Sequence, residues 1–225
     1  MALFAISDLH LSLSSNKPMD VFRGWDNYVH RLKANWNRLI TADDTVVIPG
    51  DISWCMHLND AVLDFEFINS LPGKKIMLKG NHDLWWSTSK KLNTFLEENN
   101  FDSISFVFNN AICAEDKAIC GTRGWFYDLS GEDKVVLREA GRLETSILAA
   151  KKTGLTPVVF MHYPPVYNGW VCEEIFSVIK KYNINCVYHG HIHGSGFNNA
   201  TAEYDGVKLK LLSADCVDFC PVPIL

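Results

Sequence analysis

Three of the eight histidines in this chain lie within five residues, in the stretch YHGHIHGSG that covers residues 188–196. A neutral imidazole is a common metal ligand, and glycine lets the backbone turn sharply beside a bound group. The stretch therefore predicts metal ligands at His191 and His193. A histidine-rich surface turn would have the same composition, so the rest of the chain must separate the two interpretations.

Other metal-binding side chains come directly after short apolar runs. In open α/β sheets, ligands bind at the carboxyl ends of the strands, so side chains far apart in the sequence can meet there. The runs FAIS, VVIP, IMLK, VVFM and CVYH are followed in turn by Asp8 and His10, by Asp51, by Asn81, His82 and Asp83, by His162, and by His191 and His193.

The donor types in this set narrow the chemistry. Two carboxylates, one amide oxygen and four imidazoles are too many donors for one cation, which takes about four to six. They suit two cations that share a bridging carboxylate. Nitrogen and oxygen donors without thiolate favour Mn, Fe, Zn, Co or Ni. Two such ions about 3.5–4 Å apart can clamp an in-line displacement at phosphorus and supply hydroxide from a shared water.

Each motif also has an ordinary structural interpretation. Asp8 and Asp51 could cap helices after strand–helix turns. His10 and His162 could be buried core histidines, and Asn81 with its two neighbours could form a plain turn. Five such coincidences at five strand ends are improbable together, so the combined pattern indicates a metal site.

The elements that must position these residues alternate between strands and helices. Five apolar runs predict buried strands, and periodic apolar residues predict amphipathic helices between them, which is typical of an α/β protein. The strands are expected within residues 2–7, 45–50, 75–80, 157–162 and 185–190, and the helices within residues 25–40, 58–71, 86–98, 136–148 and 171–182.

Two segments have an antiparallel pattern instead. Residues 104–122 contain three short apolar runs separated by NN and EDK, which predicts an antiparallel meander. Residues 201–213 predict a hairpin around Asp205 and Gly206. Two packed sheets with helices outside would accommodate both patterns.

Composition sets broader limits. The 225 residues are 48% hydrophobic, which suits one globular domain over residues 1–225. The net charge of −5 offers no basic face for nucleic acid. The sequence shows neither a secretion signal nor an apolar run long enough for a membrane span. Seven cysteines without a C-x-x-C pair are expected to be reduced, in a cytoplasmic protein.

In this order, the motifs D-x-H, G-D, G-N-H-[DE], a lone H and G-H-x-H resemble the calcineurin-like metallophosphoesterase superfamily, over residues 8–193. The resemblance implies a four-layer α/β/β/α sandwich of two mixed sheets. It also implies that Asp51 bridges two metals and that His82 protonates the leaving oxygen or binds the phosphoryl group. The remaining ligands would be Asp8, His10 and His193 for one metal, and Asn81, His162 and His191 for the other.

The second motif departs from the superfamily's protein Ser/Thr phosphatases. Trp54 and Cys55 stand where those proteins have an aspartate and an arginine. His82 therefore lacks that carboxylate partner and the phosphate lacks that guanidinium, which disfavours a protein phosphatase. Arg123 is the candidate replacement for substrate binding, unless it is an ordinary surface arginine.

Aromatic residues near the motifs could pack in the core or stack on a flat group such as a nucleobase. They are Trp54, Trp85, Trp86, Trp125, Tyr163, Tyr167 and Trp170.

We expect a dinuclear, divalent-metal-dependent hydrolase of phosphate mono- or diesters, with a small phosphate ester as substrate and a nucleotide as one candidate. A nuclease or a nucleotide pyrophosphatase on the same site is the alternative among enzymes, and the acidic net charge counts against a nuclease. A non-catalytic protein-binding scaffold of the same fold is the alternative class. Such a scaffold should have lost ligands, and all seven are present.

Overall fold

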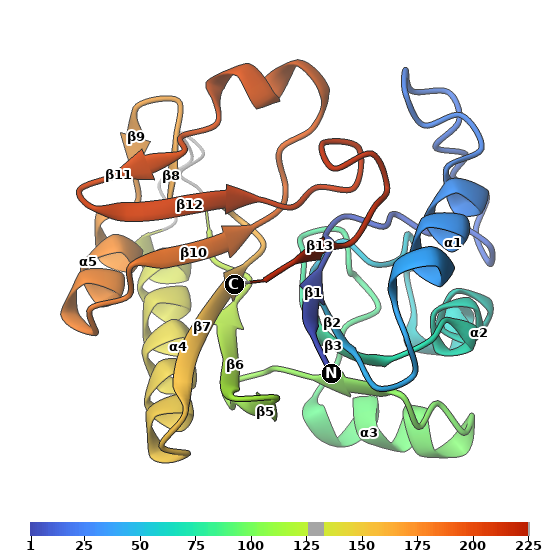
Figure 1. Cartoon of the computed structure of the whole chain (residues 1–225), viewed down its shortest axis with the longest axis horizontal. Coiled ribbons are helices and arrows are strands. Elements are labelled where there is room, and N and C mark those ends of the chain that lie inside the picture. Colours follow the sequence, from blue (N-terminus) through green and yellow to red (C-terminus); the bar gives the residue numbers. More distant parts are fainter. Residues whose placement is uncertain (126–132, 225) are drawn as a thin grey trace.

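The computed structural model describes residues 1–125 and 133–224, which form two β-sheets packed face to face with helices on both outer sides (Figure 1). In the first sheet β1 to β4 run parallel, and β13 lies antiparallel to β1 at one edge. Its strands, in spatial order, are β13 (Val222–Pro223), β1 (Leu3–Ala5), β2 (Thr45–Pro49), β3 (Lys74–Leu78) and β4 (Ile104–Phe106).

The second sheet has a parallel centre, with an antiparallel strand at each edge. Its strands, in spatial order, are β11 (Glu203–Tyr204), β12 (Val207–Leu211), β10 (Cys186–His189), β7 (Thr156–Met161), β6 (Lys117–Thr122) and β5 (Ile112–Ala114). A small separate hairpin is formed by β8 (Val166–Tyr167) and β9 (Trp170–Val171).

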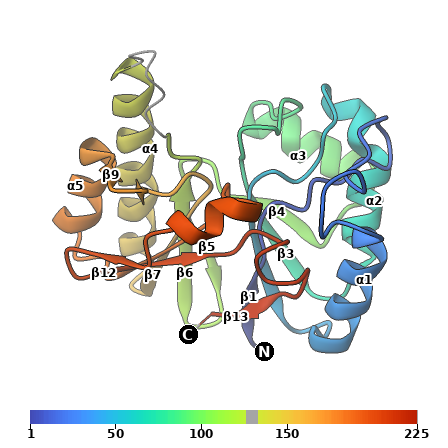
Figure 2. The same ribbon diagram turned by 90° about the horizontal axis from the view of Figure 1, so that it is seen from above.

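Helices cover the outer face of each sheet, so the layers alternate α/β/β/α (Figure 2). The first sheet is covered by α1 (Tyr28–Leu39), α2 (Val62–Ser70) and α3 (Ser89–Glu98), and the second by α4 (Asp133–Lys152) and α5 (Glu173–Lys181). Two short 3₁₀ helices, η1 (Leu58–Ala61) and η2 (Gly194–Asn199), lie in connections. The expected four-layer sandwich of two mixed sheets is confirmed.

Burial on both faces explains why the strands are apolar throughout. In β2, Val46 and Ile48 pack with Trp36 and Phe65 in the core under the helices. Val47, which points to the opposite face, packs in a separate core between the two sheets. A parallel strand covered on both sides leaves no polar face, so its sequence is a continuous apolar run rather than an alternating one.

One expectation about the strands was wrong. Residues 104–122 do not form a three-stranded meander, because β4 pairs in parallel with β3 in the first sheet, and only β5 and β6 form an antiparallel hairpin in the second. Asn109, with φ of 61°, lies in the turn where the chain passes from one sheet to the other. The hairpin around Asp205 and Gly206 is confirmed between β11 and β12, and both residues have positive φ.

Within the part of the chain that the structure describes, every helix is too short or too polar to span a bilayer.

Candidate metal centre

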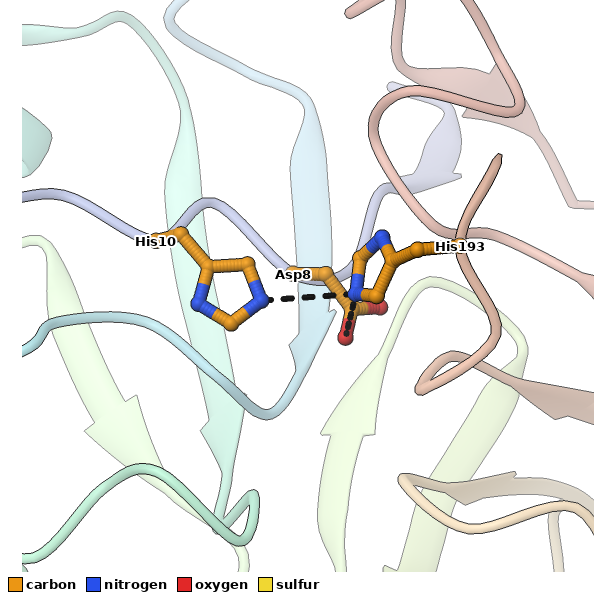
Figure 3. A group of neighbouring side chains, drawn as sticks. All are labelled: Asp8, His10 and His193. Atoms are coloured by element: carbon orange, nitrogen blue, oxygen red, sulfur yellow. Dashed lines mark hydrogen bonds and ion pairs between the residues drawn. The ribbon is translucent and has the colours of Figure 1, made fainter. Parts of the chain in front are cut away.

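Two groups of side chains lie where the carboxyl ends of strands from both sheets meet. Asp8, His10 and His193 form the first group, shown in Figure 3, and Asp51, His162 and His191 belong to the second. Within each group the potential ligand atoms lie within 4.8 Å of one another.

In the first group, the two imidazoles face each other beside the carboxylate (Figure 3). Nε2 of His10 lies 3.4 Å from Nε2 of His193, and the latter atom lies 3.3 Å from Oδ1 of Asp8. The carboxylate and the ring of His10 are buried, whereas His193 is partly open to solvent. One cation could contact all three side chains from the solvent side.

The second group also contains the amide of Asn81. Its Oδ1 lies 2.6 Å from Nε2 of His162 and 2.9 Å from Nδ1 of His191. The two ring nitrogens are 3.3 Å apart, and Nε2 of His162 is also 3.3 Å from Oδ2 of Asp51. Four donor atoms from four loops therefore converge, as a second cation site requires.

Asp51 lies between the groups. Its Oδ2 is 3.3 Å from Nε2 of His162 in the second group and 3.7 Å from Nε2 of His10 in the first. The same oxygen is 4.0 Å from Nε2 of His82. A single carboxylate in this position can contact a cation in each group.

Glycines are required because the strand-end loops pass very close to one another. A Cβ at Gly190 would lie 2.2 Å from Oδ2 of Asp8, and a Cβ at Gly80 would lie 2.1 Å from Oδ1 of Asp51. Both distances are far below van der Waals contact, so any side chain would displace a carboxylate. The glycines of the motifs thus make room for the acidic ligands of the neighbouring loop.

The ligands themselves adopt an uncommon backbone conformation. Asp8, His10, Asp51 and His191 all have positive φ, between 45° and 73°. For residues with a side chain this conformation is uncommon and costs of order 1 kcal/mol or more, and it persists where the surrounding structure holds it in place. Such backbone strain clusters at functional sites.

The hydrogen bonds of two imidazoles direct a lone pair toward the site. Nδ1 of His162 lies 3.2 Å from the carbonyl of Pro49, and Nδ1 of His193 lies 2.8 Å from Oδ1 of Asp215. If each Nδ1 donates to its oxygen partner, the neutral ring has only an acceptor left at Nε2. In the neutral rings these acceptors face further acceptors, namely oxygens of Asn81 and Asp8, so a cation or a proton must lie between them. The donor set therefore fits cations.

Burial and the neighbouring carboxylates shift the pKa values of the imidazoles in opposite directions. Burial lowers the pKa of His193, but its hydrogen bonds with Asp215 and Asp8 outweigh this and raise it to about 10. Burial lowers the pKa of His191 to about 3 and that of His10 to about 4. Although burial opposes it, interaction with His162 holds the pKa of Asp51 down at about 2. His10 and His191 are therefore neutral, as metal ligands must be, beside ionised carboxylates.

Asp83 holds the second and third motif loops together. It is fully buried, and its carboxylate accepts hydrogen bonds from both loops. The donors are the backbone N–H groups of Asp51, Ile52, Ser53 and Gly80 and the indole N–H of Trp85. Through these contacts Asp83 fixes Asp51 and Asn81 relative to each other without lying in either group.

His82 lies at the edge of the centre and is 42% exposed. Its backbone N–H donates to Oδ1 of Asp51 at 2.8 Å. Its ring packs on Trp54, with 4.3 Å between ring centroids, and Trp54 also stacks on His10 at 4.9 Å. The tryptophan that stands in place of the phosphatase aspartate therefore contacts the ring of His82, at an interplanar angle of 49°.

The guanidinium of Arg123 lies beside Glu139 and Trp125. It lies 3.8 Å from Oε1 of buried Glu139 and 4.8 Å from the ring centroid of Trp125. Its backbone carbonyl accepts hydrogen bonds from the N–H groups of His162 and Tyr163, at 3.2 and 2.8 Å. Arg123 thus supports the His162 loop through its main chain, and a contact between its side chain and substrate stays a prediction.

Two of the aromatic residues named from the sequence contact imidazoles of the centre. Trp54 stacks on His10, and the ring centroid of Tyr163 lies 4.2 Å from that of His191. Trp85 and Trp86 pack instead with the core under the helices of the first sheet. Trp170 is 62% exposed on the separate hairpin.

Sequence reasoning missed two residues at the centre. Asp215 follows the apolar run of β12, so the strand-end rule that found the other ligands would have found it too. Trp25 was assigned to a helix, but it precedes α1 and lies 5.7 Å from His10 and 5.8 Å from His193 between ring centroids. His189, the remaining histidine of the YHGHIHGSG stretch, belongs to neither group, and its Nδ1 lies 3.1 Å from the carbonyl oxygen of Gly190.

Comparison with known proteins identifies the family. A model of the calcineurin-like phosphoesterase family matches residues 1–195, and the chain therefore belongs to that family. No match was found among curated proteins.

Solved structures show the same fold. The protein of unknown function AQ665 from Aquifex aeolicus is 21% identical with a TM-score of 0.56, over 99% of this chain and 95% of that one. The phosphopantetheinyl hydrolase PptH from Mycobacterium tuberculosis is 14% identical with a TM-score of 0.51, over 100% of this chain and 95% of that one. At these identities the likeness concerns the fold alone.

The contact between Asp215 and His193 gives a testable prediction. Asp215→Asn weakens the acceptor that orients the ring, and loss of such a partner typically reduces metal affinity about 10- to 100-fold. We expect that loss in a chelator competition titration with Mn²⁺ or Zn²⁺. Asp218→Asn is the matched control, because Asp218 is 85% exposed and pairs with Arg31 instead. Equal affinities for both variants and the wild type would show that Asp215 does not orient a metal ligand.

Proposed function

We propose that this protein is a dinuclear, divalent-metal-dependent hydrolase of phosphate mono- or diesters. The observation that carries the proposal is the position of Asp51, whose Oδ2 faces His10 of one ligand group and His162 of the other. Membership of the calcineurin-like phosphoesterase family supports the same chemistry.

The ligand sets follow from the two groups. Asp8, His10 and His193 would hold one ion, Asn81, His162 and His191 the other, and Asp51 would bind both. Nitrogen and oxygen donors without thiolate favour Mn, Fe, Zn, Co or Ni. Two such ions, when bound, polarise the phosphoryl oxygens and lower the pKa of a shared water, which supplies hydroxide for in-line attack.

His82 is the residue best placed to act on the leaving group. It is half-exposed, it lies 4.0 Å from the proposed bridging oxygen, and Trp54 supports its ring. Burial lowers the pKa of His82, and the nearby Asp51 carboxylate opposes that shift. A bound phosphate ester would add negative charge beside the ring and favour its protonated, proton-donating form.

Other functions fit less well. A nuclease needs basic side chains along a nucleic-acid path, and this chain has a net charge of −5. A nucleotide pyrophosphatase would use the same centre and remains an outcome of the substrate test. A non-catalytic scaffold has no need for seven converging ligands.

We propose further that residues 1–225 act as one domain, since both sheets contribute to one core. We also propose that the protein is cytoplasmic, since all seven cysteines are free thiols.

The proposal is tested with a panel of phosphomonoesters, phosphodiesters and nucleotides, assayed with each candidate metal. We expect hydrolysis that chelator abolishes and added metal restores. Because metal ions contribute several kcal/mol to such reactions, chelation should lower the rate at least about 100-fold. His10→Ala should cause a comparable loss, whereas His30→Ala, at an exposed site on α1, should not. Hydrolysis that persists in metal-free protein, or none on any ester with any metal, would contradict the proposal.

The role of His82 is tested by comparing leaving groups. A general acid is worth about 100- to 10,000-fold when the leaving group is an alkoxide, but far less for nitrophenolate, which departs without a proton. We therefore expect His82→Ala to slow alkyl phosphate hydrolysis sharply, nitrophenyl phosphate hydrolysis less, and metal content not at all. His57→Ala, another exposed histidine, is the control. Equal losses on both substrates would leave His82 as a phosphoryl-binding residue rather than an acid.

A further inference from the structure

A pocket of about 410 Å³ opens beside the first ligand group. Its lining includes His10 and His193 of that group and also His82. This volume is in the range of small-molecule sites, roughly 300–1,000 Å³. A phosphoryl group held at the metal centre would therefore have its organic substituent directed into or past this pocket.

The pocket has a preformed apolar wall. Trp25 is 3% exposed and is held by edge contacts with Tyr28 and Phe219, at 5.3 and 5.0 Å between centroids. Trp54 stacks on His10, and its Nε1 lies 3.3 Å from the sulfur of Met19. These side chains are fixed by their neighbours, so a ligand would meet a rigid surface without first having to order it.

Phe22 is the apolar side chain of this wall that remains exposed to solvent. Phe22 lines the pocket but is 55% exposed, next to the buried Trp25 and Met19. Because about half of the Phe22 side chain is exposed to water, covering it with an apolar group would release hydrophobic free energy. A flat apolar group in the pocket would bury Phe22 and contact the tryptophan wall at once.

The charges around the pocket are unevenly paired. Asp215, the acidic residue in its lining, is engaged by His193 and by the N–H of Gly194. Arg23 also lines the pocket, and within residues 1–125 and 133–224 its guanidinium has no hydrogen bond or ion pair. Lys17 lies nearby, with Nζ 5.1 Å from the ring centroid of Trp54. Arg23 and Lys17 therefore place positive charge at the pocket that no acidic side chain among the described residues there neutralises, although the net charge of the chain is −5.

We propose that this pocket binds the alcohol part of the substrate, and that this alcohol carries a flat apolar ring and a second negative group. The ring would lie against Phe22 and the tryptophan wall, and the negative group would pair with Arg23. This inference rests on the proposed phosphoesterase function and narrows its substrate class. It makes Arg23 and Phe22 specificity-determining residues.

Three esters with alkoxide leaving groups test the proposal. Propyl phosphate lacks the ring, benzyl phosphate adds it, and 4-carboxybenzyl phosphate adds the negative group. Each is assayed as the monoester or as the methyl diester, whichever the metal-loaded enzyme hydrolyses. We expect kcat/KM to rise from propyl to benzyl to 4-carboxybenzyl, by about 3- to 10-fold at each step, mainly through KM, as aromatic contacts and a charge-assisted hydrogen bond would give.

Variants assign each step to a residue. Arg23→Gln should abolish the advantage of 4-carboxybenzyl over benzyl phosphate, and Phe22→Ala should reduce that of benzyl over propyl phosphate. Arg38→Gln and Leu137→Ala are matched controls, because both residues are exposed and lie outside the pocket. Neither control should alter the ratios. Equal kcat/KM for the three esters, or ratios that Arg23→Gln and Phe22→Ala leave unchanged, would overturn the pocket proposal while the phosphoesterase function stands.

A binding measurement separates the two proposals. The product alcohol 4-carboxybenzyl alcohol should quench tryptophan fluorescence in the wild type, and Arg23→Gln should weaken its binding about 3- to 10-fold. Binding of this kind without hydrolysis of any ester would support the pocket and contradict the proposed function. Hydrolysis of the esters without such binding would support the proposed function and contradict the pocket proposal.

Discussion

Two buried carboxylates lie among four imidazoles where the two sheets meet, and this concentration of negative charge is the constraint on which the centre depends. Removing a carboxylate from water costs of order several kcal/mol even after the protein relaxes. The imidazoles offset that cost, and the pKa of Asp8 and that of Asp51 both lie below the usual range of a carboxyl group. Cations bound between the carboxylates and neutral imidazoles would provide the same compensation.

The scaffold around the centre meets this constraint by close approach of loops. Gly80 and Gly190 leave room for the carboxylates of Asp51 and Asp8, which no larger residue would do. Asp83 then ties the second and third loops together with backbone hydrogen bonds. The ligands accept an uncommon backbone conformation because parallel strands, buried on both faces, fix the start of every loop. The geometry of the site is therefore a consequence of the sheets, the glycines and one buried acid together.

Much of this arrangement could be predicted from the sequence, because strand ends and ligand types both leave local signals. An apolar run followed by a metal-binding side chain indicates a strand end. Five such strand ends predict that residues as far apart as Asp8 and His193 belong to the same metal site. Which sheet a strand joins is not a local property, so β4 was assigned to a meander instead of the edge of the first sheet. The side-chain direction of Arg123 is not a local property either, because it depends on buried Glu139 in α4. Asp215 does have a local signal, because it follows the apolar run of β12.

The position of Asp51 between the two groups is the central claim, and metal positions test it most directly. The measurement is anomalous diffraction from crystals of protein saturated with Mn²⁺. We expect two peaks about 3.5–4 Å apart, one beside Asp8, His10 and His193 and the other beside Asn81, His162 and His191, with the carboxylate of Asp51 bound to both. A single peak at saturation, or two peaks of which Asp51 touches only one, would contradict the dinuclear centre.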